Sequence, residues 1–181
     1  HFLRYKNDSI LISYKTLNKD NPKLNCRLKN MEKFSPKRII LDNKLRTNTN
    51  SYLFKTANKD NTIIFYNEAD KSKILEFKKR KIEIIKSKID TKKRFDLKVI
   101  LKRLYKLGCR NILVEGGNEL TKDFLNKKIF NLFYLFQSPK KLSKLTEFKE
   151  FNGFNIIKRN YKNKVKINSN LEKDTITLYK K

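Results

Sequence analysis

The stretch Asn111-Ile112-Leu113-Val114-Glu115-Gly116-Gly117 decides the fold of this chain. Its three consecutive branched apolar residues predict a buried central strand, and the glycine pair predicts a tight turn. The spacing of apolar residues from Asn118 to Lys127 predicts a helix directly after that turn. A strand, a glycine turn and a helix in this order are typical of an α/β sheet with parallel strands.

The same residues suggest a ligand site. The first N–H groups of a helix lack partners inside the helix, so they attract anions, and glycine lets a ligand approach the backbone. A dinucleotide phosphate is the expected ligand, although a glycine pair often serves only to turn the chain. Glu115 ends its strand at the edge where open parallel sheets bind ligands. Its carboxylate either holds sugar hydroxyls and steers a proton or merely caps the helix, and these residues alone leave both open.

Strand and helix patterns alternate on both sides of this stretch. The clearest helix begins after Asp96, a capping residue, and ends before Gly108. Further segments are predicted as strands at Ser9–Ser13, Arg38–Asp42, Thr62–Tyr66, Ile82–Ile85 and Asn131–Phe136, as a helix at Asp70–Lys79, and as antiparallel strands after Phe154, including Thr175–Tyr179. The fold class is therefore α/β, with a mostly parallel central sheet flanked by helices and antiparallel strands at the C-terminal end. Without repeats or linkers, residues 1–181 are expected to form one domain.

A polar segment from Thr16 to Arg27 follows the first predicted strand. It is predicted as a loop, and a loop of this length in a compact domain tends to be functional. Arg4 and Arg27 stand out in a chain whose basic residues are mostly lysine, because the planar guanidinium matches the geometry of phosphate. The alternative is that both are ordinary surface arginines without a ligand.

The net charge of +27 favours, taken alone, a nucleic-acid-binding module. The lysines, however, are spread through every segment beside Asn and Ile, as in Tyr161-Lys162-Asn163-Lys164, and form no single stripe or tail. This distribution favours a solvated surface over a nucleic-acid interface. The nucleic-acid module remains the alternative from a different functional class.

Metal and membrane sites have little support. Cys26 and Cys109 are isolated and His1 is the sole histidine, so neither a disulfide framework nor a metal centre is predicted. No apolar run reaches the roughly 20 residues of a membrane span, and no signal-peptide pattern is present, so a cytoplasmic location is expected. Because the chain does not begin with Met, we expect an internal or truncated piece.

Several ordered motifs carry a resemblance to a known family. They are His1-x-Leu3-Arg4 with Asp8, Thr16-Leu17-x-x-Asp20-x-Pro22-x-Leu24-x-x-Arg27, Pro36-x-Arg38-Ile39-Ile40-Leu41-Asp42, Val114-Glu115-Gly116-Gly117-x-x-Leu120, and Ser138-Pro139-Lys140. In these motifs the chain resembles the reductase domain of the bacterial riboflavin-biosynthesis bifunctional deaminase/reductase, which has a dihydrofolate-reductase-like fold. The resemblance runs from the first residue to about residue 140, and ordered motifs are more specific than any single one.

The resemblance implies an NADPH-dependent oxidoreductase. The reaction is reduction of 5-amino-6-(5-phosphoribosylamino)uracil to the 5-phosphoribitylamino product, by hydride delivery to the ribosyl C1′. The positions matching the family's substrate contacts are Arg4, Leu24, Arg27 and Glu115, and Glu115 is the candidate catalytic residue for proton movement. The positions matching its NADPH contacts are Thr16, Asp20, Asn43, Gly117, Asn118, Glu119, Leu120, Thr121, Lys122 and Asp123. The family's usual dimer implies a homodimer.

The chain also departs from the family pattern. The family's first strand, with its K-x-A-x-S-L-D-G pattern, and the zinc deaminase signature do not occur in these residues, so deaminase activity is not assigned and activity of this piece alone stays open. Tyr5 replaces the usual Ala, Ser13 replaces the common Gly, and Lys141–Ser143 replaces a leucine-rich end. A related reductase of another substrate, such as a pterin, is the alternative within the same fold.

Overall fold

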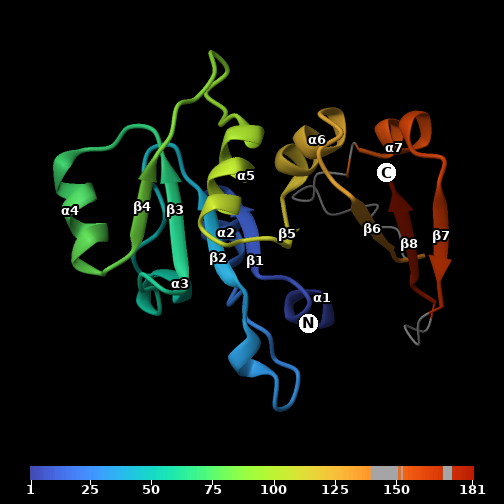
Figure 1. Ribbon diagram of the computed structural model, residues 1–181, viewed down its shortest axis with the longest axis horizontal. Coiled ribbons are helices and arrows are strands. Elements are labelled where there is room, and N and C mark those ends of the chain that lie inside the picture. Colours follow the sequence, from blue (N-terminus) through green and yellow to red (C-terminus); the bar gives the residue numbers. More distant parts are fainter. Residues whose placement is uncertain (140–150, 152, 169–172) are drawn as a thin grey trace. The chain divides into compact units, whose positions relative to one another are not determined.

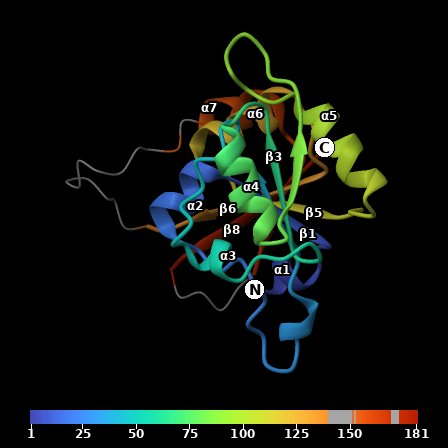
Figure 2. The ribbon, with the colours of Figure 1, turned by 90° about the vertical axis from the view of Figure 1, so that its left-hand side faces the viewer.

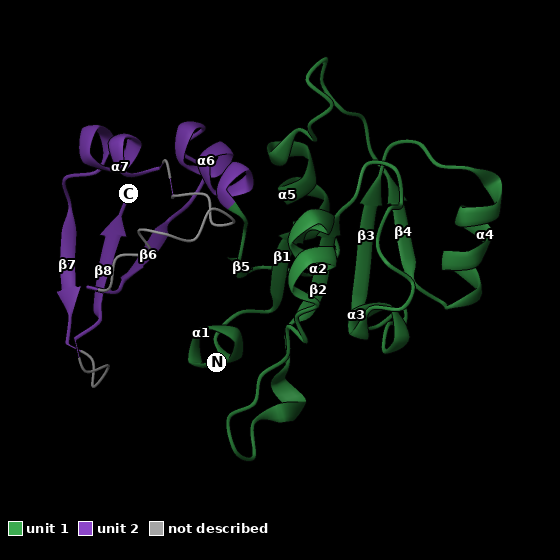
Figure 3. Ribbon diagram, turned by 180° about the vertical axis from the view of Figure 1, so that it is seen from behind, with its two compact units in different colours: residues 1–117 green, residues 118–181 purple. Residues whose placement is uncertain are grey.

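The computed structural model describes residues 1–139, 151, 153–168 and 173–181, and its elements are labelled in Figure 1. The chain divides into two compact units, His1–Gly117 and Asn118–Lys181, which Figure 3 shows in different colours. Lys140 of the Ser138-Pro139-Lys140 motif and residues 141–143 lie outside the described residues. Among the described residues, no helix combines the length and apolar character that a membrane span requires.

The first unit contains a parallel sheet of five strands. These are β1 (Ser9–Ser13), β2 (Lys37–Leu41), β3 (Thr62–Tyr66), β4 (Glu83–Lys86) and β5 (Ile112–Val114). They stand in the order β4-β3-β2-β1-β5, and each neighbouring pair is parallel. The chain therefore adds strands in one direction from β1 to β4 and then returns to the other side of β1.

Helices cover both faces of this sheet. They are α2 (Tyr14–Asp20), α3 (Tyr52–Lys55), α4 (Lys71–Lys79) and α5 (Leu97–Lys106). Two further short helices, α1 (Phe2–Tyr5) and a 3₁₀ helix at Glu32–Phe34, contain no buried residues. Figure 2, a view toward the β4 edge, shows α2 and α3 on one side of the sheet and α5 on the other. A parallel sheet covered in this way buries consecutive residues, which explains why β1, β2 and β3 are apolar runs without alternation.

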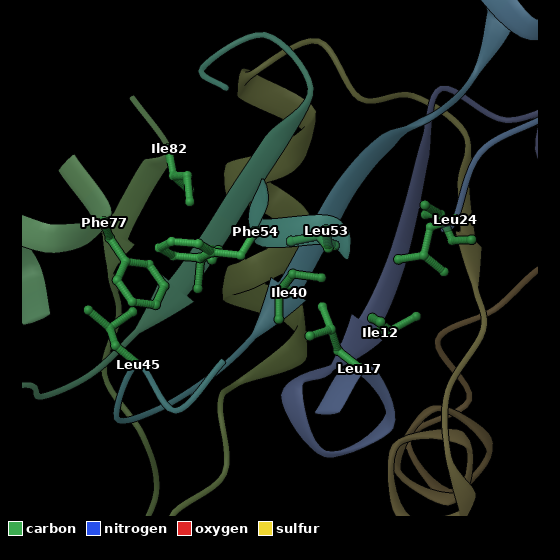
Figure 4. Close-up of a cluster of buried hydrophobic side chains, with 11 residues drawn as sticks. Ile12, Leu17, Leu24, Ile40, Leu45, Leu53, Phe54, Phe77 and Ile82 are labelled. Atoms are coloured by element: carbon green, nitrogen blue, oxygen red, sulfur yellow. The ribbon is translucent and has the colours of Figure 1, made fainter. Parts of the chain in front are cut away.

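The main core lies between the sheet and the α2, α3 and α4 side. Ile12 and Ile40 from neighbouring strands pack there with Leu17 of α2, Phe54 of α3 and Phe77 of α4 (Figure 4). The rings of Phe54 and Phe77 meet edge to face with centroids 4.9 Å apart. Burial of a large apolar side chain stabilises the fold by about 1.5–3 kcal/mol, so this cluster supplies much of the unit's stability.

The second unit contains an antiparallel sheet and two helices. The strands β6 (Leu132–Gln137), β8 (Thr175–Lys180) and β7 (Lys164–Ile167) stand in the order β6-β8-β7, and the helices are α6 (Asn118–Asn126) and α7 (Phe154–Asn160). Tyr161 follows α7 and donates its phenolic O–H to the carbonyl oxygen of Leu125 in α6, at 2.8 Å. Leu125, Ile157 and Tyr161 form the buried cluster of this unit.

The α/β class, the parallel sheet and the antiparallel C-terminal strands are confirmed. The strands at residues 9–13 and 62–66 have the predicted bounds, and the Asp96 carboxylate caps α5 by accepting from the Lys98 N–H at 2.9 Å. Gly108 follows that helix with φ at +88°. Such a backbone conformation is favourable for glycine and strained for other residues, which explains the stop.

Two expectations are wrong. The segment from Thr16 to Arg27 is not a loop throughout, because α2 occupies Tyr14–Asp20. Ser13 caps this helix, and Asn21 ends it in the left-handed region with φ at +41°. The strand at residues 112–114 is not central within the described sheet, where it pairs only with β1.

Candidate functional site

The site is positioned by the neighbouring strands β1 and β5. Ser9 pairs with Ile112 and Leu11 with Val114, and the Glu115 N–H continues the pairing by donating to the Leu11 carbonyl oxygen at 3.1 Å. The direction of strand addition reverses between these two strands. Open α/β sheets bind ligands at such a reversal, beyond the carboxyl ends of the strands. The residues that follow β1 and β5 therefore form the candidate site.

Gly117 and Thr16 lie against each other at this edge. A Cβ atom placed on Gly117 would lie 3.0 Å from the Thr16 Oγ1 atom. The Thr16 hydroxyl is held by the Ser13 hydroxyl, 3.1 Å away, and the Ser13 Oγ accepts from the Thr16 N–H at 3.3 Å. A side chain at position 117 would therefore displace a fixed hydroxyl, and glycine leaves the backbone open to a ligand.

Glu115 is held by Arg4 in a bidentate ion pair. The Nε and Nη2 atoms of Arg4 each donate to one carboxylate oxygen at 2.8 Å, and Nη1 donates to the Asn25 carbonyl oxygen at 3.2 Å. The Arg4 side chain is 17 % exposed and that of Glu115 is 36 % exposed. Hydrogen bonding to Glu115 raises the pKa of Arg4 above its ordinary value despite partial burial. The ion pair fixes the direction of the carboxylate, and the hydrogen bond to Asn25 ties α1 to the segment after α2.

Arg27 and Leu24 belong to that same segment. Arg27 is exposed, and its backbone N–H and its Nε donate toward the two ring nitrogens of His1, at 3.1 and 3.2 Å. A neutral imidazole has one acceptor nitrogen, so only one of these hydrogen bonds forms at a time. The side chain of Leu24 is 1 % exposed and packs in the core, with φ at +56°.

The remaining predicted residues are more dispersed. Asp20 ends α2 as an exposed side chain, and Asn43 follows β2, where its Oδ1 accepts from Arg46 at 2.8 Å. In the described part of the chain, no hydrogen bond joins either residue to Thr16 or Gly117. Residues 118–123 form the first turns of α6 in the second unit, where Glu119 and Lys122 form an ion pair at 3.2 Å.

Sequence reasoning missed Ser13 and Asn25. Ser13 holds Thr16, and a serine between a strand and a helix is a recognisable capping signal. The backbone carbonyl of Asn25 fixes Arg4, and a backbone contact of this kind leaves no signal in residue identity.

Comparison with known proteins identifies the family. The family model described as the RibD C-terminal domain matches residues 1–160. The riboflavin biosynthesis protein RibD of Actinobacillus pleuropneumoniae is 31 % identical over 137 residues, which cover 76 % of this chain and 36 % of that protein. The 5-amino-6-(5-phosphoribosylamino)uracil reductase of Buchnera aphidicola is 29 % identical over 150 residues, covering 77 % of this chain and 69 % of that protein.

A solved structure of RibD from Acinetobacter baumannii matches with a TM-score of 0.74 at 17 % identity, covering 99 % of this chain and 48 % of that one. The chain thus spans about half the length of that protein, and about a third of the RibD from Actinobacillus. The structural likeness confirms the predicted dihydrofolate-reductase-like fold. Together, the matched residues and the shared fold show that the chain belongs to the RibD C-terminal domain family.

Proposed function

We propose that residues 1–181 are a single reductase domain that reduces 5-amino-6-(5-phosphoribosylamino)uracil with NADPH in riboflavin biosynthesis. Family membership supports the reaction class, and the activity for which the Buchnera relative is named supports the substrate. The observation that carries the proposal is the reversal of strand order between β1 and β5, which brings Thr16 and Gly117 to one edge. A homodimer and a cytoplasmic location are part of the same proposal.

The residues at this edge fit a dinucleotide. Gly117 presents bare backbone against the Thr16 hydroxyl, and both are suited to contact a phosphate oxygen. When bound, NADPH supplies the hydride. The contribution of the protein is to hold both reactants in line and to keep the Thr16 hydroxyl fixed through Ser13.

Arg27 and Glu115 serve the substrate in this proposal. Among the described residues, Arg27 contacts His1 through its Nε and its backbone N–H, so its exposed Nη groups are available for the substrate phosphate. Arg4 directs the Glu115 carboxylate, whose remaining lone pairs accept hydrogen bonds from ribose hydroxyls. Glu115 is thereby placed to assist the proton transfer that accompanies hydride delivery to C1′.

The cofactor assignment is tested by thermal denaturation. A ligand that binds only the folded state adds about 2.7 kcal/mol of stability at 100 times its dissociation constant. We expect NADPH to raise the melting temperature in a saturable manner and NADH to raise it less. An unchanged melting temperature at millimolar NADPH would remove the cofactor assignment.

The substrate assignment is tested with Arg27→Ala. We expect the KM for the phosphorylated substrate to rise at least about tenfold, equal to about 1.4 kcal/mol, with unchanged NADPH affinity. Arg103→Ala, which removes an exposed arginine from α5, is the matched control. Equal losses of substrate and NADPH affinity in Arg27→Ala would contradict its assigned role, and turnover of an unphosphorylated pterin would favour the alternative substrate class.

A further inference from the structure

The first unit contains a small pocket whose two charged side chains, Lys23 and Arg38, have no role in the proposed reaction. Its volume is about 190 Å³, and it opens between the segment after α2, the start of β2 and α3. The residues that matter for its chemistry are Lys23, Asn25, Arg38, Tyr52, Thr56 and Asn61. Leu24, which matches a substrate contact of the family, also lines it, whereas Arg27, Glu115 and Gly117 do not.

Arg38 lines this pocket and is only 6 % exposed, whereas Lys23, the other charged residue of the lining, is exposed. Its Nε donates to the Thr62 Oγ1 at 3.1 Å, and its Nη1 donates to the Thr56 Oγ1 at 2.8 Å. Its Nη2 donates to the Thr56 carbonyl oxygen at 3.0 Å and to the Asn61 Oδ1 at 2.8 Å. A guanidinium has five N–H groups, so one N–H on Nη1 is not used by these contacts.

All these acceptors are neutral. No carboxylate in the described part of the chain forms an ion pair with Arg38, although buried charges in proteins are as a rule paired. Burial lowers the pKa of the Arg38 guanidinium below its ordinary value, which reflects the same lack of a counter-charge. The hydrogen-bond requirement of Arg38 is largely met, but its charge is not balanced.

Two neighbours make the pocket suitable for an anion. Lys23 lies at the pocket with its ammonium group 5.5 Å from the centre of the Tyr52 ring, which adds a second positive charge. The Oδ1 atom of Asn25 is buried and has no hydrogen-bond partner among the residues that the structure describes. This amide is able to accept a hydrogen bond from a P–OH group or, with its oxygen and nitrogen exchanged, to donate to an anionic oxygen.

We propose that this pocket binds a phosphate-sized oxyanion, with Arg38 at its base and Lys23 at its side. The ligand is either free inorganic phosphate or the phosphate group of a small monoester. The volume is several times the roughly 30 Å³ that one water molecule takes in the liquid, so a tetrahedral oxyanion fits. A bound anion supplies the charge that Thr56, Thr62 and Asn61 do not.

The competing explanation is that Arg38 only ties β2 to α3 and to the start of β3. Lys23→Ala separates the two explanations, because it removes a pocket charge and leaves every hydrogen bond of Arg38 in place. Lys55→Ala is the matched control, since Lys55 is an exposed lysine of α3 that does not line the pocket. The strongly positive chain attracts phosphate everywhere, so ionic strength is held constant with chloride.

Titration calorimetry and ¹⁵N NMR with inorganic phosphate test the proposal. We expect a saturable site that persists in Arg27→Ala, a shift of the Arg38 Nε–Hε signal with the same saturation, and a loss of affinity of about threefold to tenfold in Lys23→Ala but not in Lys55→Ala. The Arg38 signal is assigned from its disappearance in Arg38→Lys. If that variant does not fold, the arginine side chains are labelled selectively, and the Arg38 signal is the one whose response to phosphate is weakened by Lys23→Ala. Equal losses in Lys23→Ala and Lys55→Ala, or an Arg38 signal that phosphate does not move, would overturn the proposal.

Ribose 5-phosphate and ribose, measured in the Arg27→Ala background to weaken binding at the proposed substrate site, distinguish the two sources of the oxyanion. Tighter binding of ribose 5-phosphate than of phosphate, weakened by Lys23→Ala, supports a monoester, and equal binding supports free phosphate. Binding of ribose with the affinity of ribose 5-phosphate would contradict an oxyanion site. NADPH stabilisation is measured on the same variants, so a failure of this pocket is separate from a failure of the reductase assignment.

Discussion

Gly117 and Gly108 are glycines for different physical reasons, and this difference gives a paired test at the scale of single residues. Gly117 faces the Thr16 hydroxyl, whereas Gly108 has φ at +88° and open space around it. We expect Gly117→Ala to raise the dissociation constant of NADPH about tenfold, equal to about 1.4 kcal/mol, because the added methyl group occupies space through which the ligand reaches the backbone. Gly108→Ala should instead cost about 1–2 kcal/mol of stability through backbone strain and leave NADPH affinity unchanged. Fluorescence titration and urea denaturation measure the two effects, and identical behaviour of the two variants would refute the assignment of Gly117.

Arg4 and Glu115 act as a unit, because each nitrogen of the bidentate contact meets one carboxylate oxygen. Arg4→Lys keeps the charge but loses the planar fork. We expect Arg4→Lys and Glu115→Gln each to lower kcat/KM at least about tenfold, and the double variant to be little worse than either single one. Steady-state kinetics on the three variants provides the check, and additive losses would show that the two side chains act independently.

The caps of α2 and α3 extend this reasoning to helices and strands. Ser13 caps α2 and Ser51 caps α3, each accepting from the N–H three residues later. Ser13→Ala and Ser51→Ala should each destabilise the protein by about 1 kcal/mol. Only Ser13→Ala should also weaken NADPH binding several-fold, because Thr16 loses its anchor. Equal NADPH affinities in the two variants would show that Thr16 needs no support from Ser13.

The link between α6 and α7 predicts a response to alkaline pH. Burial raises the pKa of Tyr161, whose O–H donates to Leu125. A pKa that is raised on folding contributes stability that is complete below the unfolded value of about 10 and is lost as pH rises through the folded pKa. Tyr161→Phe should therefore cost about 1 kcal/mol at pH 7 and show a smaller loss of stability above pH 10. Urea denaturation at pH 7, 9 and 10.5 measures this, and parallel pH profiles would contradict it.

Elements with a local sequence signal could be predicted here, whereas contacts between residues far apart in the sequence could not. The bounds of β3 follow from its branched and aromatic run between polar residues, and α5 follows from its regular apolar spacing and Asp96 cap. The helix α2 was missed because Leu17 is its only buried side chain, which leaves no apolar periodicity. Thr16 and Gly117 lie close together because they follow β1 and β5, which are neighbouring parallel strands. The pairing of Arg4 with Glu115, 111 residues apart, depends on sheet order and has no local signature.

The charge of the whole molecule makes a further prediction. With a net charge of +27, lysine repulsion opposes the compact state, and salt screens it over about 10 Å at 0.1 M. We expect the melting temperature to rise between 0.05 and 0.5 M NaCl. Binding to duplex DNA should be diffuse at low salt and vanish near 0.15 M. Saturable DNA binding at that ionic strength would instead favour the nucleic-acid-binding module.

The pairing of β1 with β5 also dictates an order of events during synthesis. Residue Ser9 meets Ile112, and the Asp8 carboxylate accepts from the N–H groups of Arg110 and Asn111 at 2.8 and 2.7 Å. At about 5–20 residues per second, a ribosome needs roughly 5–20 s to make the intervening chain. During synthesis, β1 therefore lacks its neighbour β5 after β2 and β3 have already been made. We expect pulsed hydrogen exchange to show β2 and β3 protected before β5, and a nascent chain that stops short of residue 110 to be the form most dependent on chaperones.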